Sequence, residues 1–209
     1  MNKLFIGGLL MLGMTIANAA ETAKSIVIYF SHTGENYSVG VIKEGNTAKV
    51  AKEIARVTKA DLWEIKETDT YPSNYKACID RAKKELQAKA RPAFQGTVPD
   101  LSKYETIYLG YPTWWGSAPM VVYSVLEKAK IDGKTIYPFC THEGSGLGST
   151  ASKLAKTFPK AKIAQNGMDL YGHVAQKDAE AVKKAVAEWL KKTGKIIAED
   201  KKADMLTTW

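Results

Sequence analysis

Six consecutive residues, Ser25 to Phe30 (SIVIYF), restrict the fold of this chain more than any other feature. The run is apolar and rich in β-branched and aromatic side chains, without the polar alternation of a strand that has one face in water. A strand of this kind must be covered on both faces, as in a parallel sheet with helices on each side. The run therefore predicts a buried central strand of an α/β fold.

Strand-like and helix-like segments alternate along the rest of the chain. Further strands are expected at 61–66, at 106–111, at 135–140 and within 162–170. Helices are expected at about 46–57, 71–90, 119–128, 149–157 and 177–192. This alternation predicts a doubly wound five-stranded parallel sheet with right-handed crossovers and helices on both faces.

The two ends of the chain depart from this pattern. Residues 1–19 (MNKLFIGGLLMLGMTIANA) contain one lysine, an apolar stretch and a final Ala-x-Ala, which predicts a Sec-type signal peptide cleaved after Ala19. The stretch is too short for a comfortable membrane span. We expect an exported protein, periplasmic in a Gram-negative host and secreted otherwise, without a membrane span after cleavage. Residues 20–195 would then form one domain and residues 196–209 a loose tail.

Charge and cysteine content narrow the possible classes of function. The formal charge is +8, but the lysines occur in scattered pairs, which favours solvated helix faces over a nucleic-acid-binding strip. Three histidines without ligand spacing and only two cysteines argue against a metal site. Cys78 and Cys140 could pair in an oxidising compartment, although free thiols are favoured because the segments that carry them are expected far apart.

The loop after the first strand has the composition of a phosphate site. It reads SHTGEN from Ser31 and continues to Gly45-Asn46-Thr47 at a predicted helix start. Hydroxyls, glycines and free backbone N–H groups at a helix N-terminus bind phosphate well. The loop matches neither the Walker pattern nor G-x-G-x-x-G. The alternative is a capped helix preceded by a long surface loop.

The loops after the third and fourth strands are suited to a flat ring. Residues 111–119 (YPTWWGSAP) place two tryptophans side by side, and at least one should be exposed or lie in a cleft, where it could stack on a ring. Residues 141–148 (THEGSGLG) hold three glycines that let the backbone approach a ligand. The alternatives are core tryptophans and a mobile loop. The three loops together predict a site for a mononucleotide with a flat ring, such as flavin mononucleotide (FMN).

Through these three motifs, residues 24–192 resemble the flavodoxin family, and in particular flavodoxin-like proteins with a P-x-W-W-G ring loop. The resemblance implies a flavodoxin-like sheet order 2-1-3-4-5, non-covalent FMN and electron transfer. It implies phosphate contacts from Ser31, Thr33, Gly34, Asn46 and Thr47. It implies ring contacts on one side from Pro112, Thr113, Trp114, Trp115 and Gly116, and on the other from Thr141, His142, Gly144, Ser145 and Gly146. Residues 35–45 look like an insertion in the family's phosphate loop, so the phosphate ligand could be Asn36 or Thr47.

Three functions fit this site. The leading hypothesis is an FMN-binding electron-transfer protein of the cell envelope that serves a redox partner protein or a small electron donor or acceptor. The alternatives are an FMN-dependent NAD(P)H or quinone reductase, and a flavodoxin fold without FMN that binds another ligand or protein. The chain has no separate nicotinamide-binding domain, which favours the carrier. No catalytic residue is required. His142 could stabilise a reduced, anionic flavin or pass a proton, or it could be a structural loop residue.

Overall fold

A computed structural model describes residues 24–195 of the chain. Its parallel sheet has the strand order β4-β1-β5-β6-β7, and β8 also pairs with β6. The strands are β1 (Lys24–Phe30), β4 (Asp61–Ile65), β5 (Tyr104–Pro112), β6 (Thr135–His142), β7 (Lys162–Ile163) and β8 (Met168–Tyr171). This is the predicted order 2-1-3-4-5. The predicted signal peptide and the predicted loose tail lie outside the described residues.

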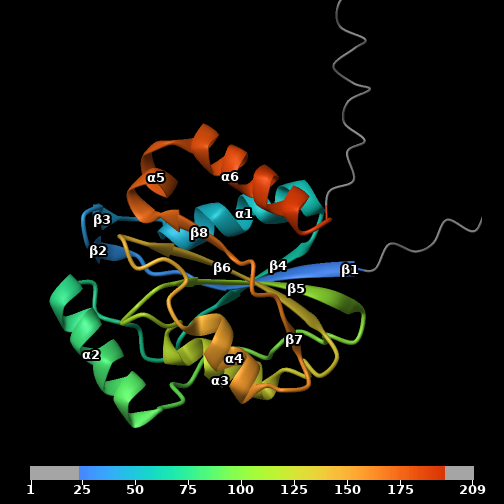
Figure 1. The fold of residues 1–209 in the computed structure, drawn as a ribbon. Helices are drawn as coiled ribbons and strands as arrows, with labels where there is room; N and C mark the ends of the chain where they lie inside the picture. The colour runs from blue at the N-terminus through green and yellow to red at the C-terminus, as the bar shows by residue number, and fades with distance from the viewer. Residues whose placement is uncertain (1–23, 196–209) are drawn as a thin grey trace, which may run out of the picture.

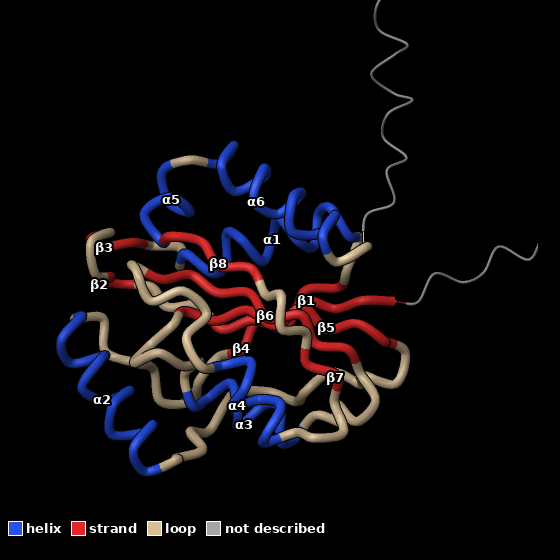
Figure 2. The backbone as a smooth tube through the Cα atoms, in the orientation of Figure 1, coloured by secondary structure: helices blue, strands red, loops and turns tan. Residues whose placement is uncertain are grey.

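Helices cover both faces of the sheet (Figures 1 and 2). They are α1 (Asn46–Thr58), α2 (Tyr75–Ala88), α3 (Met120–Lys128), α4 (Thr150–Thr157), α5 (Gly172–Lys177) and α6 (Ala179–Lys192). Ile26, Ile28 and Phe30 of β1 pack with α2, α3 and α4, whereas Val27 and Tyr29 pack with α1, α5 and α6. The run that predicted a central strand is therefore buried from both sides.

At the centre of the sheet, a glycine lets an aromatic ring of the neighbouring strand approach the backbone closely. Gly110 of β5 is paired with Phe139 of β6, and a Cβ atom at position 110 would lie 2.2 Å from Cζ of the Phe139 ring. The aromatic ring lies across the neighbouring strand in space that a side chain at position 110 would fill. On the same face, the Phe139 ring packs against Trp189 of α6.

Two expected elements differ in the structure. Helix α2 begins at Tyr75 and not at Tyr71, because the Asn74 side chain caps it by accepting a hydrogen bond from the Ala77 N–H at 3.1 Å. Tyr71 precedes the helix and is buried against Phe30. The expected fifth strand is two short strands, β7 and β8, and the extra helix α5 follows β8 before α6 begins.

Residues 34–42 form a hairpin that the sequence did not reveal. Strands β2 (Gly34–Asn36) and β3 (Gly40–Ile42) are antiparallel and form a sheet of their own. Figure 1 places them beside α2, at the end of the molecule away from the start of β1. The turn uses left-handed backbone at Ser38 (φ 57°) and Gly40 (φ 93°). The predicted insertion at 35–45 is thus a structured element.

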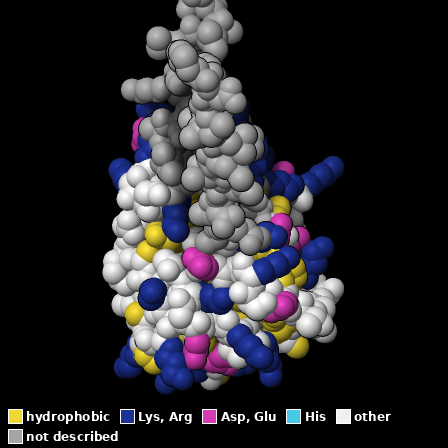
Figure 3. Space-filling model, turned by 90° about the vertical axis from the view of Figure 1, so that its right-hand side faces the viewer, with side chains coloured by type: hydrophobic (Ala, Val, Ile, Leu, Met, Phe, Trp, Pro, Cys, Tyr) yellow, Lys and Arg dark blue, Asp and Glu magenta, His cyan; other side chains and the backbone are white. Residues whose placement is uncertain are grey.

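The opposite end of the molecule, where the main strands begin, is shown in Figure 3. On the visible part of this face, lysine and arginine side chains are interspersed with aspartate and glutamate. Within residues 24–195, no helix combines the length and the apolar character that a membrane crossing requires.

Candidate functional site

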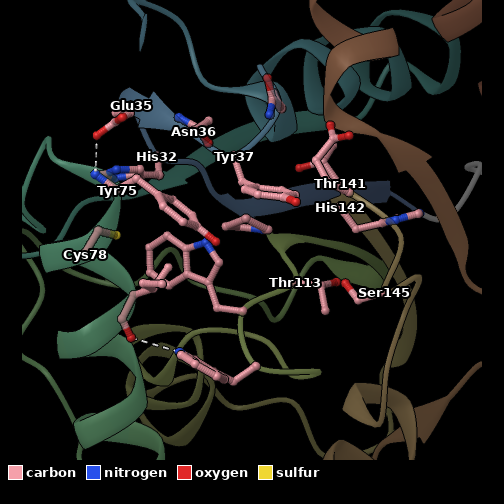
Figure 4. Close-up of a pocket in the computed structure, with 16 residues that line it drawn as sticks. His32, Glu35, Asn36, Tyr37, Tyr75, Cys78, Thr113, Thr141, His142 and Ser145 are labelled. Carbon is pink, nitrogen blue, oxygen red and sulfur yellow. Dashed lines mark hydrogen bonds between the residues drawn. The ribbon is translucent and has the colours of Figure 1, made fainter. Parts of the chain in front are cut away.

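A cleft of about 310 Å³ lies at the carboxyl ends of β1, β5 and β6. Nine of the predicted site residues line it: Asn36, Asn46, Pro112, Thr113, Trp114, Trp115, Thr141, His142 and Ser145. Seven other residues complete the lining: His32, Glu35, Tyr37, Tyr75, Cys78, Ile79 and Glu143. Figure 4 shows Glu35, His32, Tyr75 and Cys78 at one end of the cleft, and Thr113, Thr141, His142 and Ser145 at the other. The remaining predicted residues, Ser31, Thr33, Gly34, Thr47, Gly116, Gly144 and Gly146, do not line the cleft.

The loop after β1 folds back onto the N-terminus of α1. Gly45 is the N-cap residue and has no side chain to cap the helix, while the Ser31 hydroxyl accepts a hydrogen bond from the Ala48 N–H at 3.0 Å. A Cβ atom at Gly45 would lie 2.2 Å from Ser31 Oγ and 2.6 Å from the His32 carbonyl oxygen. The glycine is therefore required for this contact, which brings the positive end of α1 to the edge of the cleft.

The two candidate phosphate ligands lie on different elements. Asn36 is in strand β2, where its Nδ2 donates to the Gly34 carbonyl at 3.2 Å. Thr47 is in the first turn of α1, and its buried hydroxyl lies 2.8 Å from the Thr141 hydroxyl. Beside it, Asn46 Oδ1 accepts a hydrogen bond from Gln176 at 2.9 Å. Thr47 therefore lies at the N-terminus of α1, which residues 45–47 form, while Asn36 lies in the hairpin.

The two tryptophans have different surroundings. The Trp114 ring lies 5.0–5.7 Å from those of Phe30, Tyr71 and His32, edge-on to each. Trp115 is 47% exposed and adopts left-handed backbone with φ 51°. Its indole Nε1 donates to the Ile79 carbonyl of α2 at 2.8 Å. Trp114 therefore joins the cleft to the core, and Trp115 forms an exposed rim.

The loops after β5 and β6 are tied to each other by hydrogen bonds. The Thr113 N–H donates to the Thr141 carbonyl at 2.9 Å, and the Thr113 hydroxyl donates to the Gly146 carbonyl at 2.8 Å. Both the N–H and the hydroxyl of Ser149 donate to the Gly116 carbonyl at 2.9 Å. We call residues 112–116 and 141–146 the strand-loop wall of the cleft.

His142 is held by hydrogen bonds from both ring nitrogens. Its Nδ1 accepts from the Gly144 N–H at 2.8 Å, so the proton is assigned to Nε2, which donates to Asp169 at 3.0 Å. Next to it, Glu143 accepts from the N–H and from Nδ1 of His173, each at 2.8 Å. The side chains of His142 and Glu143 thus fix the loop to β8 and α5. Both ring nitrogens of His142 are used in hydrogen bonds.

The hairpin forms a second wall together with α2. The Glu35 carboxylate accepts hydrogen bonds from the Tyr75 N–H at 2.8 Å and from Asn74 Nδ2 at 3.1 Å. The Glu35 N–H also donates to the Ser73 carbonyl at 2.7 Å. The ring of Tyr37 lies 5.7 Å from that of Tyr75 at an angle of 31°. We call residues 34–42 and 75–79 the hairpin wall.

His32 has an unpaired polar atom at this end of the cleft. It is 8% exposed, and its Nε2 has no hydrogen-bond partner within residues 24–195. Burial lowers the pKa of His32, which favours the neutral ring. A buried polar atom without a partner costs about 1–3 kcal/mol, so a ligand that bonds this nitrogen would recover part of that cost.

The cysteines are separate, neutral thiols. Cys78 and Cys140 are both buried and free, and burial raises the pKa of each thiol to about 12. Cys78 faces the cleft from α2, while Cys140 Sγ lies 3.3 Å from the Gly146 carbonyl. The described residues contain no cluster of three or more His, Cys, Asp or Glu side chains that could hold a metal ion.

Sequence signals for the additional cleft residues were weak. Tyr75, Cys78 and Ile79 precede the third main strand by some distance and show no ligand pattern of their own. They reach the cleft because β4 lies next to β1, so the chain that leaves β4 comes up at the same edge of the sheet. His32 lies inside the phosphate-loop motif, so its position in the sequence alone could have indicated it.

Comparisons with known proteins agree with this architecture. A family model described as flavodoxin matches residues 24–193. A protein of Bacteroides eggerthii DSM 20697, provisionally described as a flavoprotein, is 28% identical, with a TM-score of 0.64, and the match covers 82% of this chain and 98% of that one. The corresponding protein of Bacteroides uniformis ATCC 8492 is 29% identical, with a TM-score of 0.65 and coverages of 81% and 98%.

A flavoprotein of Lactobacillus acidophilus NCFM, described in complex with FMN, shares the fold at 21% identity and a TM-score of 0.56, with coverages of 70% and 92%. None of the curated proteins compared with the chain matches it. The family match spans nearly all of the described residues, and the chain belongs to the flavodoxin family.

Proposed function

We propose that this protein binds FMN without a covalent bond and works as an electron carrier. The observation that carries the proposal is the meeting of a helix N-terminus, an aromatic rim and a fixed glycine-rich loop at one cleft. The cleft lies where the order of strands reverses, between β1 and β5, which is the usual ligand position in such sheets.

The residues of the cleft fit the parts of FMN. The phosphate would lie at residues 45–47, where backbone N–H groups and the α1 dipole favour an anion and where a Cβ atom at Gly45 would prevent the contact. The flat ring would lie against the strand-loop wall, with Trp115 at the rim. His32 lines the cleft, and its buried Nε2 has no hydrogen-bond partner within residues 24–195.

The side chains of the cleft bind and orient; none is placed as a nucleophile. The carboxylates of Glu35 and Glu143 are committed to the N-termini of α2 and α5, and the Cys78 thiol is neutral because burial raises its pKa to about 12. When bound, FMN supplies the capacity to accept and donate electrons, and the protein supplies position and electrostatics.

The family match supports this proposal, and the Lactobacillus acidophilus protein shows that the same fold can hold FMN. The proposed partner and the proposed location rest on the sequence alone. The charge of +8 favours a redox partner with an acidic docking surface. Residues 1–19 favour export, which is tested by determining the N-terminus of the protein from the cell envelope: Ala20 is expected, and an intact Met1 would contradict it.

The proposal is tested by titrating the purified protein with FMN while flavin fluorescence and visible absorption are followed. One-to-one binding with quenched fluorescence is expected. Riboflavin, which lacks the phosphate, should bind at least about tenfold more weakly, because the charge-assisted bonds to residues 45–47 are lost. A folded protein that does not bind FMN would contradict the proposal. Steady oxidation of NAD(P)H by the loaded protein alone would favour a reductase over a carrier.

A further inference from the structure

One side of the cleft is not explained by the loops that predicted a flavin. The hairpin wall brings Glu35, Tyr37 and Tyr75 to the cleft, and the first two of these residues come from the hairpin itself. Tyr37 is 59% exposed, so the hydrophobic core does not account for its position. It nevertheless lies against Tyr75, and both rings line the cleft. Figure 4 shows the Tyr37 ring between the two ends of the cleft.

The hairpin is fastened to the N-terminus of α2 mainly through Glu35. Glu35 bonds the N-terminus of α2 through the Tyr75 N–H and the Asn74 side chain, and its own N–H bonds the Ser73 carbonyl. The contact is close enough to require a glycine next to it, since a Cβ atom at Gly34 would lie 2.8 Å from the Ser73 oxygen. These contacts fix the position of the hairpin at the edge of the cleft.

An independent observation at the same end of the cleft points to a ligand. His32 is more than nine-tenths buried, lines the cleft and has an Nε2 atom without a partner within residues 24–195. The residues that line the cleft beside the hairpin wall therefore include one with an unsatisfied buried polar atom as well as two aromatic rings.

We infer that the hairpin β2–β3 is a working part of the flavin site, in which Tyr37 packs on the bound flavin and Glu35 fastens the hairpin to α2. The inference rests on the proposed function. In it, Tyr37 is a binding residue because it touches the ligand, whereas Glu35 is a positioning residue because it acts through the hairpin.

The test measures the equilibrium dissociation constant and the dissociation rate of FMN for four variants of the full chain. Tyr37→Ala should raise the dissociation constant about 3- to 10-fold, the range expected for one lost aromatic contact. Tyr37→Phe should restore nearly normal binding, because the ring is kept. Glu35→Ala should raise the dissociation rate by about 5-fold with little change in the association rate, because a loosened wall mainly shortens the lifetime of the complex.

Val41→Ala is the matched control. Val41 is on the same hairpin, paired with Glu35, is 82% exposed and does not line the cleft. This variant should bind FMN as the parent does. Since Tyr37 and Val41 are both exposed, neither change threatens the fold, and circular dichroism verifies that each variant is folded.

The outcomes separate the two proposals. Suppose that the parent binds FMN, and that the variants Tyr37→Ala and Glu35→Ala bind and release FMN as the parent does. In that case the proposed role of the hairpin is wrong, and the proposed function stands. If Val41→Ala weakens binding as much as Tyr37→Ala, the effect is general to the hairpin surface and the role of the Tyr37 ring is wrong. If the folded parent does not bind FMN, both proposals are wrong.

Discussion

The two walls of the cleft are built on different principles. The strand-loop wall is formed by two loops that continue buried strands, and hydrogen bonds of Thr113 and Ser149 join these loops to each other. The hairpin wall presents aromatic rings, and the Glu35 carboxylate fastens it to α2. The first wall is continuous with the central sheet, while the second combines a separate two-stranded sheet with the start of α2.

The two walls should therefore have different roles in binding a ligand. A wall that extends buried strands cannot move without disturbing the core, so it can fix the position of a ligand. A wall held by a few polar contacts at the surface opens at lower cost, so it can control how long a ligand stays. Variants of each wall should therefore differ in whether they change the affinity or the lifetime of the complex with a ligand.

The largest effect is expected at the contact between the β1 loop and the N-terminus of α1. Gly45→Ala should raise the FMN dissociation constant by about 100-fold, because the new Cβ atom pushes the loop off the helix N-terminus and removes charge-assisted bonds to phosphate. The displaced loop should also cost about 1–3 kcal/mol of unfolding free energy. Fluorescence titration and denaturant unfolding measure the two effects.

Gly96→Ala is the control for that change. A Cβ atom at Gly96 meets nothing within 4 Å, so only its φ of +75° is unfavourable. This variant should lose about 1 kcal/mol of stability and retain its affinity for FMN. Equal affinities of the two variants for FMN would remove the phosphate role of residues 45–47.

Removal of the hairpin is expected to have the next largest effect. Deleting residues 34–44 joins Thr33 to Gly45, which already lies against His32, and leaves a continuous S-H-T-G-N-T loop. The protein should fold and bind FMN about 10- to 30-fold more weakly, because the Tyr37 contact and the Glu35 bonds are lost together. Stopped-flow release should show that the loss is mainly in the dissociation rate. Slower association with unchanged release would reverse the assignment of the two walls.

A smaller effect is expected at the rim of the strand-loop wall. Trp115→Ala should raise the FMN dissociation constant by about 10-fold if the indole stacks on the ring. Trp115→Phe keeps a ring but loses the bond to the Ile79 carbonyl, so it separates the stacking surface from the anchor on α2. If Trp115→Phe binds as weakly as Trp115→Ala, the anchor is the important part.

The smallest effect is a dependence of stability on pH. Burial lowers the pKa of His32 in the folded protein, so as the pH falls the unfolded chain takes up this proton first. Above the unfolded pKa of about 6.5, protonation of His32 has no effect on the free energy of unfolding. As the pH falls below that value, it lowers the free energy of unfolding by at most about 1.4 kcal/mol per pH unit. His32→Gln should therefore show a shallower loss of unfolding free energy between pH 7 and pH 5. Parallel curves for the two proteins would show that His32 does not contribute.

Much of the fold could be predicted from the sequence because its signals are local. The run from Ser25 to Phe30 has no polar positions in its centre, and the strands at 106–111 and 135–140 have similar composition, so hydrophobicity alone identifies them. The predicted start of α2 was wrong because Tyr71-Pro72 resembles the start of a helix. The Asn74 side chain supplies the actual cap. The hairpin was missed because its strands are three residues long and show no alternation.

The site was predictable to the extent that its residues lie in loops directly after buried strands. Thr113 and Thr141 are found in this way, and both line the cleft. Tyr75 could not be found in this way, since it is brought to the cleft beside Glu35 by a hydrogen bond between residues 40 positions apart. A long-range contact of this kind leaves no pattern in a single sequence.

The packing of Phe139 across Gly110 has a consequence for how sequences of this family can diverge. Neither residue can change freely alone: a side chain at position 110 collides with the ring, and a small residue at position 139 leaves a cavity beside Trp189. Drift at these two positions should therefore be correlated, with a larger residue at one accompanied by a smaller residue at the other. Related chains that keep the glycine should also keep the aromatic ring, so the two residues should be inherited together.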